Sequence, residues 1–160
     1  MLESTQGYQF PDPSSLHERQ REEASFAYLI PFVTIIGGLP LPIINLLVCV
    51  AYWKYVQKKS PFVRFHALQS LFTTVPIVLI NAGVVYIVVQ LAFYDWSYES
   101  WMGGYFLAAI VFNLIEFIFN IYAAINARKG KSFLFIGFGA MAYDLVDWDD
   151  EEDNQFMPEL

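Results

Sequence analysis

Three polar side chains in residues 100–127 have the spacing that places them on one face of a helix. Asn113, Glu116 and Asn120 stand at positions i, i+3 and i+7, which are neighbouring positions along a helix. Glu116 is the one charged residue of this apolar stretch. An acidic side chain at the centre of a membrane-spanning helix costs about 2.5–3.5 kcal/mol on insertion scales, and such residues usually face protein or water.

Two interpretations of this polar stripe are open. In the first, the three side chains form a protonatable site or a conduit for protons or small solutes. In the second, a protonated Glu116 hydrogen-bonds to Asn81, which lies at about the same depth in residues 67–94, or to another amide, and holds helices together. The outer half of the stretch, YFLAAIVF, carries no amide or charged side chain. Because a conduit needs polar groups along its whole path, we favour the structural interpretation.

Outside the apolar stretches, His66 and a run of acids near the C-terminus are the candidates for chemistry. No second His, Cys or carboxylate stands at metal-ligand spacing to His66, so we expect a hydrogen-bonded anchor at the membrane boundary. The acidic run lacks the central glycine and closing glutamate of a calcium loop. We expect a solvated tail, with docking to a basic cytoplasmic partner as the alternative. The acids concerned are Asp147, Asp149, Asp150, Glu151, Glu152 and Asp153.

Patterns typical of enzymes and nucleic-acid-binding proteins are absent from the sequence. We find no Ser/His/Asp or Cys/His arrangement and no phosphate-cradling glycine loop. Cys49, the single cysteine, lies in an apolar run and is expected to be buried. The chain also lacks an extended basic face. The sequence therefore predicts a non-catalytic protein without catalytic residues, cofactor or metal, and without a nucleic-acid partner.

The distribution of charge along the 160 residues determines the class of protein. Residues 25–53, 67–94 and 100–127 contain a single charged residue, although the chain has 9 basic and 16 acidic residues. Hydrophobic residues make up 56% of the sequence and the mean hydropathy is +0.41. A soluble domain would show charges every few positions, so this pattern excludes a soluble fold and indicates a multi-pass membrane protein.

The expected fold is an all-α, polytopic bundle of four transmembrane helices within residues 25–131. Two glycines and two prolines in GGLPLP, residues 37–42, break any straight helix, so the first two spans should form a short hairpin. The third span should begin at Ser60 and Pro61 and be kinked by Pro76. The fourth span should cover residues 104–126 and be closed by Gly130. Whether residues 25–53 cross twice or only dip into the membrane is left open.

The cations predict the orientation of the chain. With four spans, all nine Lys and Arg residues fall on one side, as the positive-inside rule requires. Both termini are therefore expected in the cytoplasm, with the protein in the cell inner membrane, and no cleavable signal peptide is read. Three segments flank the membrane domain: a cytoplasmic arm at 1–24, an apolar interfacial or docking segment at 132–146, and an acidic tail at 147–160.

Two stretches on the cytoplasmic side resemble the signatures of a known family. SPFVRFHALQSLF and IYAAINARKGKSFLF are similar to motifs of small, uncharacterised four-helix bacterial membrane proteins, which are distantly similar to the channel-like subunit of the chloroplast inner-envelope protein-import translocon. The resemblance covers residues 25–136. The positions that match the pattern are Arg64, His66, Gln69, Ala127, Gly130 and Lys131.

From these observations we expect a non-catalytic subunit of a larger inner-membrane complex. The expected partners are other integral membrane proteins and the lipid bilayer. The resemblance implies a role as an accessory of protein translocation or export. The alternative function is the small-solute or proton conduit built on Asn113, Glu116 and Asn120.

Overall fold

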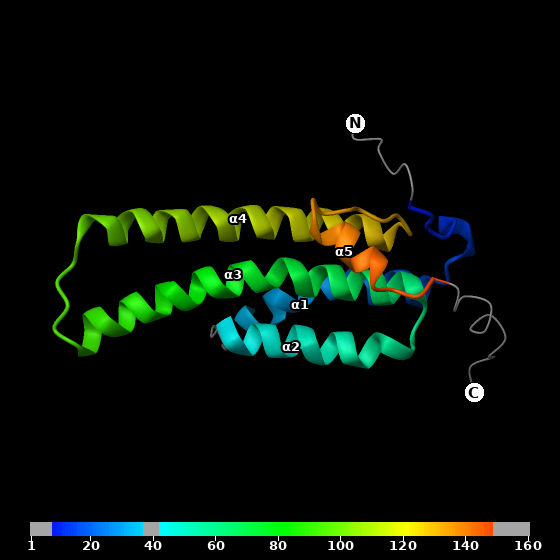
Figure 1. Ribbon diagram of the computed structural model, residues 1–160. Coiled ribbons are helices and arrows are strands. Elements are labelled where there is room, and N and C mark those ends of the chain that lie inside the picture. Colours follow the sequence, from blue (N-terminus) through cyan, green and yellow to red (C-terminus); the bar gives the residue numbers. More distant parts are fainter. Residues whose placement is uncertain (1–7, 37–41, 149–160) are drawn as a thin grey trace.

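The computed structural model describes residues 8–36 and 42–148, and every regular element in them is a helix (Figure 1). This confirms the all-α prediction for the described part of the chain. Five α-helices and two short 3₁₀ turns follow one another. They are η1 (Pro13–Ser15), α1 (Glu18–Ile36), α2 (Pro42–Tyr55), η2 (Val56–Lys58), α3 (Pro61–Phe93), α4 (Ser100–Arg128) and α5 (Phe138–Asp144).

Helices α3 and α4 form a long antiparallel hairpin. They contain 33 and 29 residues, or about 50 and 44 Å at 1.5 Å per residue. In the described part of the chain, these two helices are the ones long and apolar enough to cross a membrane. Most of their apolar side chains are not covered by other parts of the molecule, as expected for helices in contact with lipid.

Helices α1 and α2 are too short to support the predicted count of four spans. α1 has 19 residues, and it begins with the charged sequence ERQREE. α2 has 14 residues, about 21 Å, against a bilayer core of about 30 Å. The structure thus supports two candidate spans and does not confirm four. Most of the Gly/Pro turn predicted to link α1 and α2, at 37–41, lies outside the described residues.

The short helices lie beside only one half of the α3–α4 hairpin (Figure 1). The ring of Phe32 in α1 is 5.0 Å from the ring of Phe117 in α4, centroid to centroid. Cys49 Sγ in α2 is 4.0 Å from Thr74 Oγ1 in α3. α1 runs antiparallel to α4, and α2 runs antiparallel to α3. The last turn of α1 is therefore level with residue 113 of α4, and the first turn of α2 is level with residue 81 of α3.

The buried core occupies this four-helix half. Small side chains of α1 face small side chains of α4, which lets the two backbones approach closely. Larger apolar residues of α1, η2 and α3 complete the core. The alanines are Ala24, Ala27, Ala123, Ala124 and Ala127, and the larger residues include Tyr28, Val56, Phe62, Phe65 and Leu68.

Local sequence signals explain where the long helices begin, bend and end. Pro61 occupies the start of α3, where its missing amide costs nothing. Pro76 lies inside α3, and the helix changes direction in its middle part (Figure 1). Gly130 has φ +74°, and the amides of Gly130 and Lys131 donate to the carbonyls of Ala127 and Asn126, both at 2.9 Å. This is a Schellman motif, so the predicted glycine cap of α4 is confirmed.

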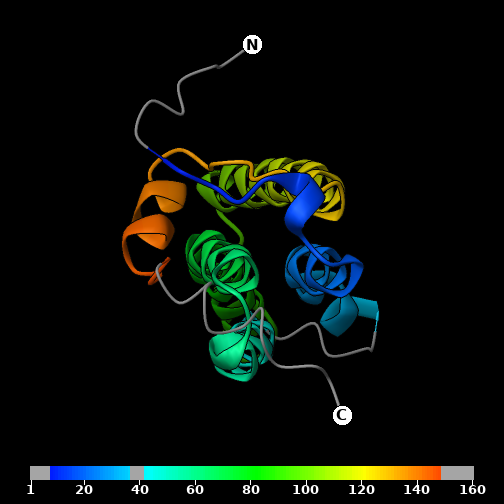
Figure 2. The ribbon, with the colours of Figure 1, turned by 90° about the vertical axis from the view of Figure 1, so that its right-hand side faces the viewer.

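Both terminal segments return to the same end of the bundle (Figure 2). Residues 8–16 cross the end of α4, where the Cβ of Pro13 lies 3.0 Å from the position that a side-chain Cβ would take at Gly130. Asp12 caps η1 by accepting hydrogen bonds from the Ser14 amide at 2.7 Å and hydroxyl at 2.6 Å, and these bonds lower the pKa of its carboxyl group. α5 packs against α3.

Candidate functional site

Asn81 and Asn113 form a reciprocal amide pair between α3 and α4. Asn81 Nδ2 donates to Asn113 Oδ1 at 3.0 Å, and Asn113 Nδ2 donates to Asn81 Oδ1 at 2.8 Å. Asn113 Nδ2 also donates to the carbonyl of Ala109 at 2.7 Å. The pair lies at the level where the four-helix half ends, and it joins the two long helices there.

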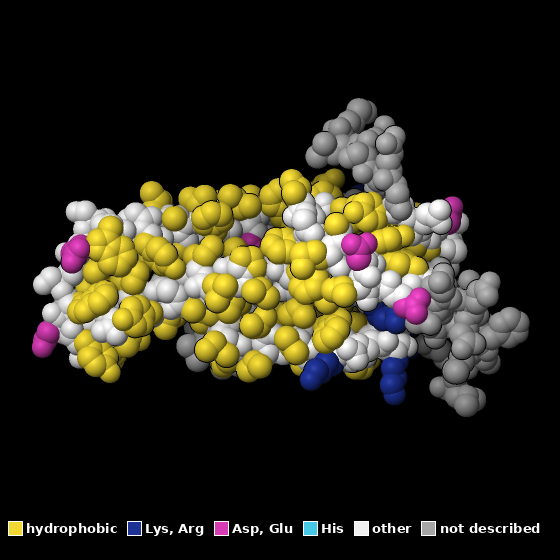
Figure 3. All heavy atoms as spheres, in the orientation of Figure 1, with side chains coloured by type: hydrophobic (Ala, Val, Ile, Leu, Met, Phe, Trp, Pro, Cys, Tyr) yellow, Lys and Arg dark blue, Asp and Glu magenta, His cyan; other side chains and the backbone are white. Residues whose placement is uncertain are grey.

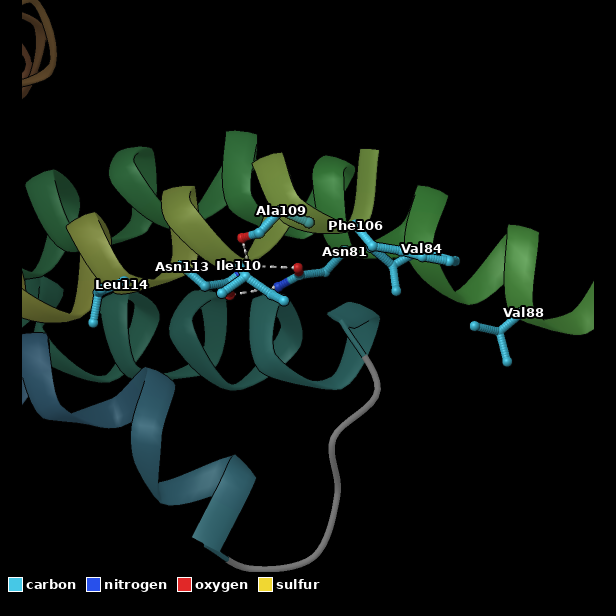
Figure 4. A pocket seen from close by; sticks show the side chains of 8 residues that line it. All are labelled: Asn81, Val84, Val88, Phe106, Ala109, Ile110, Asn113 and Leu114. Atoms are coloured by element: carbon cyan, nitrogen blue, oxygen red, sulfur yellow. Dashed lines mark hydrogen bonds between the residues drawn. The ribbon is translucent and has the colours of Figure 1, made fainter. Parts of the chain in front are cut away.

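An apolar groove opens beside this pair, between the parts of α3 and α4 that α1 and α2 do not cover (Figure 4). Its volume is about 710 Å³. Apart from the two asparagines, its lining is apolar: Val84, Val88, Phe106, Ala109, Ile110 and Leu114. The groove offers no charge for binding a polar solute, and its surface suits hydrocarbon.

Glu116 does not bond to Asn81, because Asn113 holds that amide. Glu116 is partly buried, and its Oε1 atom has no hydrogen-bond partner among the described residues. Asn120 is completely buried, and neither of its amide atoms has a partner there. The predicted stripe therefore divides into a satisfied pair at Asn113 and an unsatisfied cluster at Glu116 and Asn120.

His66 belongs to a buried polar network that joins α1, α3 and the segment after α4. His66 Nδ1 is 2.8 Å from the hydroxyl of Tyr28. Gln69 Nε2 donates to the same hydroxyl at 2.7 Å and to the Phe133 carbonyl at 2.8 Å. All three side chains are fully buried. This geometry is that of a structural anchor, with the motif residues His66 and Gln69 of α3 turned inward.

The other residues of the motif lie at the end of the bundle. Arg64 Nη2 donates to the carbonyl of Asp147 at 2.7 Å and so ties the C-terminal segment to α3. Gly130 provides the left-handed cap of α4, and Lys131 beside it is exposed. The remaining tail acids proposed for docking, residues 149–153, lie outside the described residues.

An aromatic cluster fixes the two terminal segments on α3. The ring of Phe10 is 5.1 Å from Phe65, 5.3 Å from Tyr143 and 5.4 Å from Trp148. The backbone amide of Gln9 donates to the Tyr143 hydroxyl at 3.0 Å. Aromatic pairs at these separations each contribute about 0.5–1.5 kcal/mol beyond area burial. The segment 132–146 therefore packs in part on the protein's own N-terminal residues.

The opposite end of the molecule is the α3–α4 loop, which carries two exposed acids. Asp95 has φ +39°, and Glu99 stands directly before α4. Glu99 Oε2 accepts a hydrogen bond from Trp101 Nε1 at 2.9 Å. The aromatic side chains Tyr94, Trp96, Tyr98 and Trp101 surround the acids and are exposed, as in an aromatic belt at a membrane surface.

The two ends therefore differ in charge, because acids lie at both ends and cations at one, with an apolar surface between them (Figure 3). The described cations all lie at the end where α2, α4 and the terminal segments meet. Ion pairs there link α1 to its neighbours: Lys59 Nζ is 3.2 Å from Glu23 Oε1, and Arg128 Nη1 is 2.7 Å from Glu22 Oε1. In the described ranges, no three His, Cys, Asp or Glu side chains are placed to hold a metal ion together.

Two sets of residues were missed as candidates from sequence. Tyr28 lies in an apolar run, where only its hydroxyl could have indicated a partner for His66. Asp95 and Glu99 were not considered as a site. Their signal was available, because residues 95–99, between the second and third apolar stretches, contain acids and no cation.

The relatives of this chain follow from a match to the model of a protein family. The magnetosome magnetite crystal formation protein family matches residues 20–138, well over half of the chain. The chain belongs to the magnetosome magnetite crystal formation protein family. Searches of curated proteins and of solved structures found no match.

This assignment corrects two predictions. The resemblance to the translocon-like membrane proteins is wrong, although both stretches that suggested it lie within the matched residues. Short motifs rich in apolar and small residues occur in many membrane bundles, so they misidentified the family. Neither the translocation accessory nor the solute conduit is supported, because the matching family is one of magnetite formation. The membrane context of this family agrees with the two long apolar helices, α3 and α4.

Proposed function

We propose that this chain is a non-catalytic membrane protein that acts in magnetite formation by presenting the α3–α4 loop to the crystal. The exposed carboxylates of Asp95 and Glu99 would bind iron ions at the crystal surface, since carboxylate oxygens are common iron ligands in proteins. The family match over residues 20–138 supports a role in magnetite formation. The observation that supports the site is the pair of exposed acids at the end opposite the cations.

The proposed topology has two complete spans, α3 and α4, and a hairpin of α1 and α2 that enters and leaves on the same side. This arrangement keeps every cation on the cytoplasmic side, as four spans would, so the positive-inside rule does not require four. Both termini would be cytoplasmic, and the loop with Asp95 and Glu99 would face the compartment in which the crystal forms. We place the protein in the membrane that bounds this compartment.

Binding to magnetite particles tests the loop directly. Full-length protein in lipid nanodiscs exposes both ends, so adsorption onto particles can be compared between variants at equal protein concentration. The double change Asp95→Asn with Glu99→Gln should lower adsorption severalfold, because it removes both carboxylates and keeps side-chain size. Asp144→Asn is the matched control, because Asp144 is an exposed acid at the opposite end. Equal adsorption of the double variant and the wild type would refute the proposal.

The same variants can be examined during crystal growth. Magnetite co-precipitated in the presence of nanodiscs carrying the wild-type protein should differ in particle size from magnetite formed with empty nanodiscs. The double loop variant should give the distribution of the empty nanodiscs, and Asp144→Asn that of the wild type. If the control variant lost the effect as well, general negative charge and not the loop would be responsible.

A further inference from the structure

The unequal lengths of the helices give the membrane domain different widths in the two halves of a bilayer. Asn81 and Asn113 mark the level at which α1 ends and α2 begins. Within residues 8–36 and 42–148, four packed helices lie on one side of this level and two lie on the other (Figure 1). The narrow part extends twelve residues from Asn81 to Phe93, about 18 Å, which is comparable to one leaflet.

Aromatic side chains indicate where the bilayer lies relative to this step. Trp101 at the loop end and Tyr122 at the cationic end of α4 are both exposed and are twenty-one residues apart, or about 32 Å. This is the thickness of a bilayer core. Asn113 lies between them, about 18 Å from Trp101 and about 14 Å from Tyr122. The step from four helices to two is therefore close to the bilayer centre.

The narrow part presents its apolar surface outward. Leu107, Ile110 and Phe112 of α4 are between 50% and 65% exposed, and Tyr86, Val88 and Phe93 of α3 are between 50% and 78% exposed. Together with the apolar groove, this surface suits acyl chains filling the space that α1 and α2 leave empty. With a diameter of about 10 Å, each helix occupies about 80 Å² of membrane area, so the leaflets differ by about 160 Å².

We propose that the membrane domain is a wedge with its wide end at the cations, and that the protein prefers strongly curved bilayers whose convex leaflet receives that end. A convex leaflet has more area per lipid chain at its outer surface, so it accommodates the wider half with less strain. The partner in this interaction is the curved lipid surface. The preference arises from shape and needs no charge on the lipid.

A membrane tube pulled outward from a giant vesicle of phosphatidylcholine tests this preference at equilibrium. The neutral lipid excludes attraction to the cations. Lys58→Cys in a Cys49→Ser background places a dye at the wide end, because Lys58 is exposed there. A membrane-impermeant quencher then separates molecules with the wide end outside from those with it inside. The two orientations act as controls for each other in one membrane.

Molecules with the wide end outside should be enriched in the tube by at least about twofold, and molecules with it inside should be depleted. Equal densities for both orientations, or the reverse sign, would overturn the proposal. If second copies of this chain filled the narrow part, the wedge would be absent. The two orientations would then also have equal densities, and cross-linking would show oligomers.

Substitutions that widen the narrow end provide a second measurement. A Cβ at Gly104 would have nothing within 4 Å and Ala108 is exposed, so Gly104→Trp with Ala108→Trp adds bulk at the surface of the narrow half. This variant should sort less strongly than the wild type. Ile118→Trp with Ile125→Trp, at exposed positions of the wide half, should sort at least as strongly. Unchanged sorting of the first variant would contradict the wedge.

Discussion

At the scale of single residues, two groups of buried or partly buried polar side chains are joined by hydrogen bonds across helices. The Asn81–Asn113 pair satisfies both amides within an apolar surrounding. The hydroxyl of Tyr28 is hydrogen-bonded to both His66 and Gln69. Because lipid offers no replacement hydrogen bonds, removing one member leaves the other unsatisfied. These pairs therefore determine which helix faces come together.

Asn113→Leu should destabilise the bundle by about 1–2 kcal/mol, because it leaves the Asn81 amide without its partner. The double change Asn81→Leu with Asn113→Leu should cost less than the sum of the single changes. We expect a coupling of about 0.5–1.5 kcal/mol, within the range measured between membrane helices. Unfolding in lipid bicelles measures all four states of this cycle. Strict additivity would show that the pair contributes nothing.

Tyr28→Phe should destabilise the protein by about 1–3 kcal/mol, because His66 and Gln69 lose a common partner and keep their burial. Tyr122→Phe is the control, since Tyr122 is 52% exposed and its ring contact with Phe133 would persist. Unfolding in lipid bicelles measures the stability of both variants. If both variants had equal stability, the network around His66 would not hold α1 in place.

At the scale of elements, the structure depends on close approach at a few glycines. Gly83 of α3 lies directly against the ring of Tyr105, whose hydroxyl donates to the carbonyl of Ile80 at 2.8 Å. Gly130 lets residues 8–16 lie across the end of α4. Both contacts join segments that are distant in sequence, and both have a matched glycine elsewhere that lacks the contact.

Gly83→Ala should destabilise the α3–α4 hairpin by about 1–3 kcal/mol, because the new methyl group would force Tyr105 out of its place. Gly104→Ala should be neutral or stabilising, since that helical glycine has nothing within 4 Å and alanine favours helix by about 1 kcal/mol. Thermal unfolding in detergent compares them. A destabilised Gly104→Ala variant would point to a contact outside this chain.

Gly130→Ala and Gly137→Ala should each destabilise the protein by about 1–2 kcal/mol, because alanine disfavours a left-handed backbone. The φ angles at these positions are +74° and +78°. Only at Gly130 would the new methyl group also crowd Pro13, at 3.0 Å from its Cβ, so Gly130→Ala should loosen the N-terminal segment. Limited proteolysis between residues 8 and 16 should therefore be faster in Gly130→Ala alone. Equal cleavage of both variants would show that Gly130 does not position this segment.

At the scale of the whole molecule, the proposed topology has one leaflet with four helices and one with two. Accessible cysteines test it in a Cys49→Ser background. Ser97→Cys in the loop should react with an impermeant reagent only from the non-cytoplasmic side, and Lys58→Cys only from the cytoplasmic side. Ile43→Cys, at the exposed start of α2, should react from neither side. Its reaction from the non-cytoplasmic side would restore the model of four complete spans.

The sequence by itself indicated a membrane protein, the clustering of the cations at one end, the glycine cap at Gly130 and a break near residues 37–42. These features depend on composition and on local backbone preferences, so they can be read along the chain. The spacing of Asn113, Glu116 and Asn120 correctly placed polar groups on α4. It did not identify Asn113 as the partner of Asn81, because predicted depth in the membrane favoured Glu116 for that contact.

Tertiary structure decided how far α1 and α2 reach, which amides pair, and that Tyr28 meets His66. Each of these depends on side-chain packing between segments that are far apart in sequence. A proline-containing apolar run of thirteen residues has the same pattern whether its helix crosses a membrane or stops at the centre. Only its contacts with α3 and α4 set the depth at which it ends, and with it the wedge shape of the molecule.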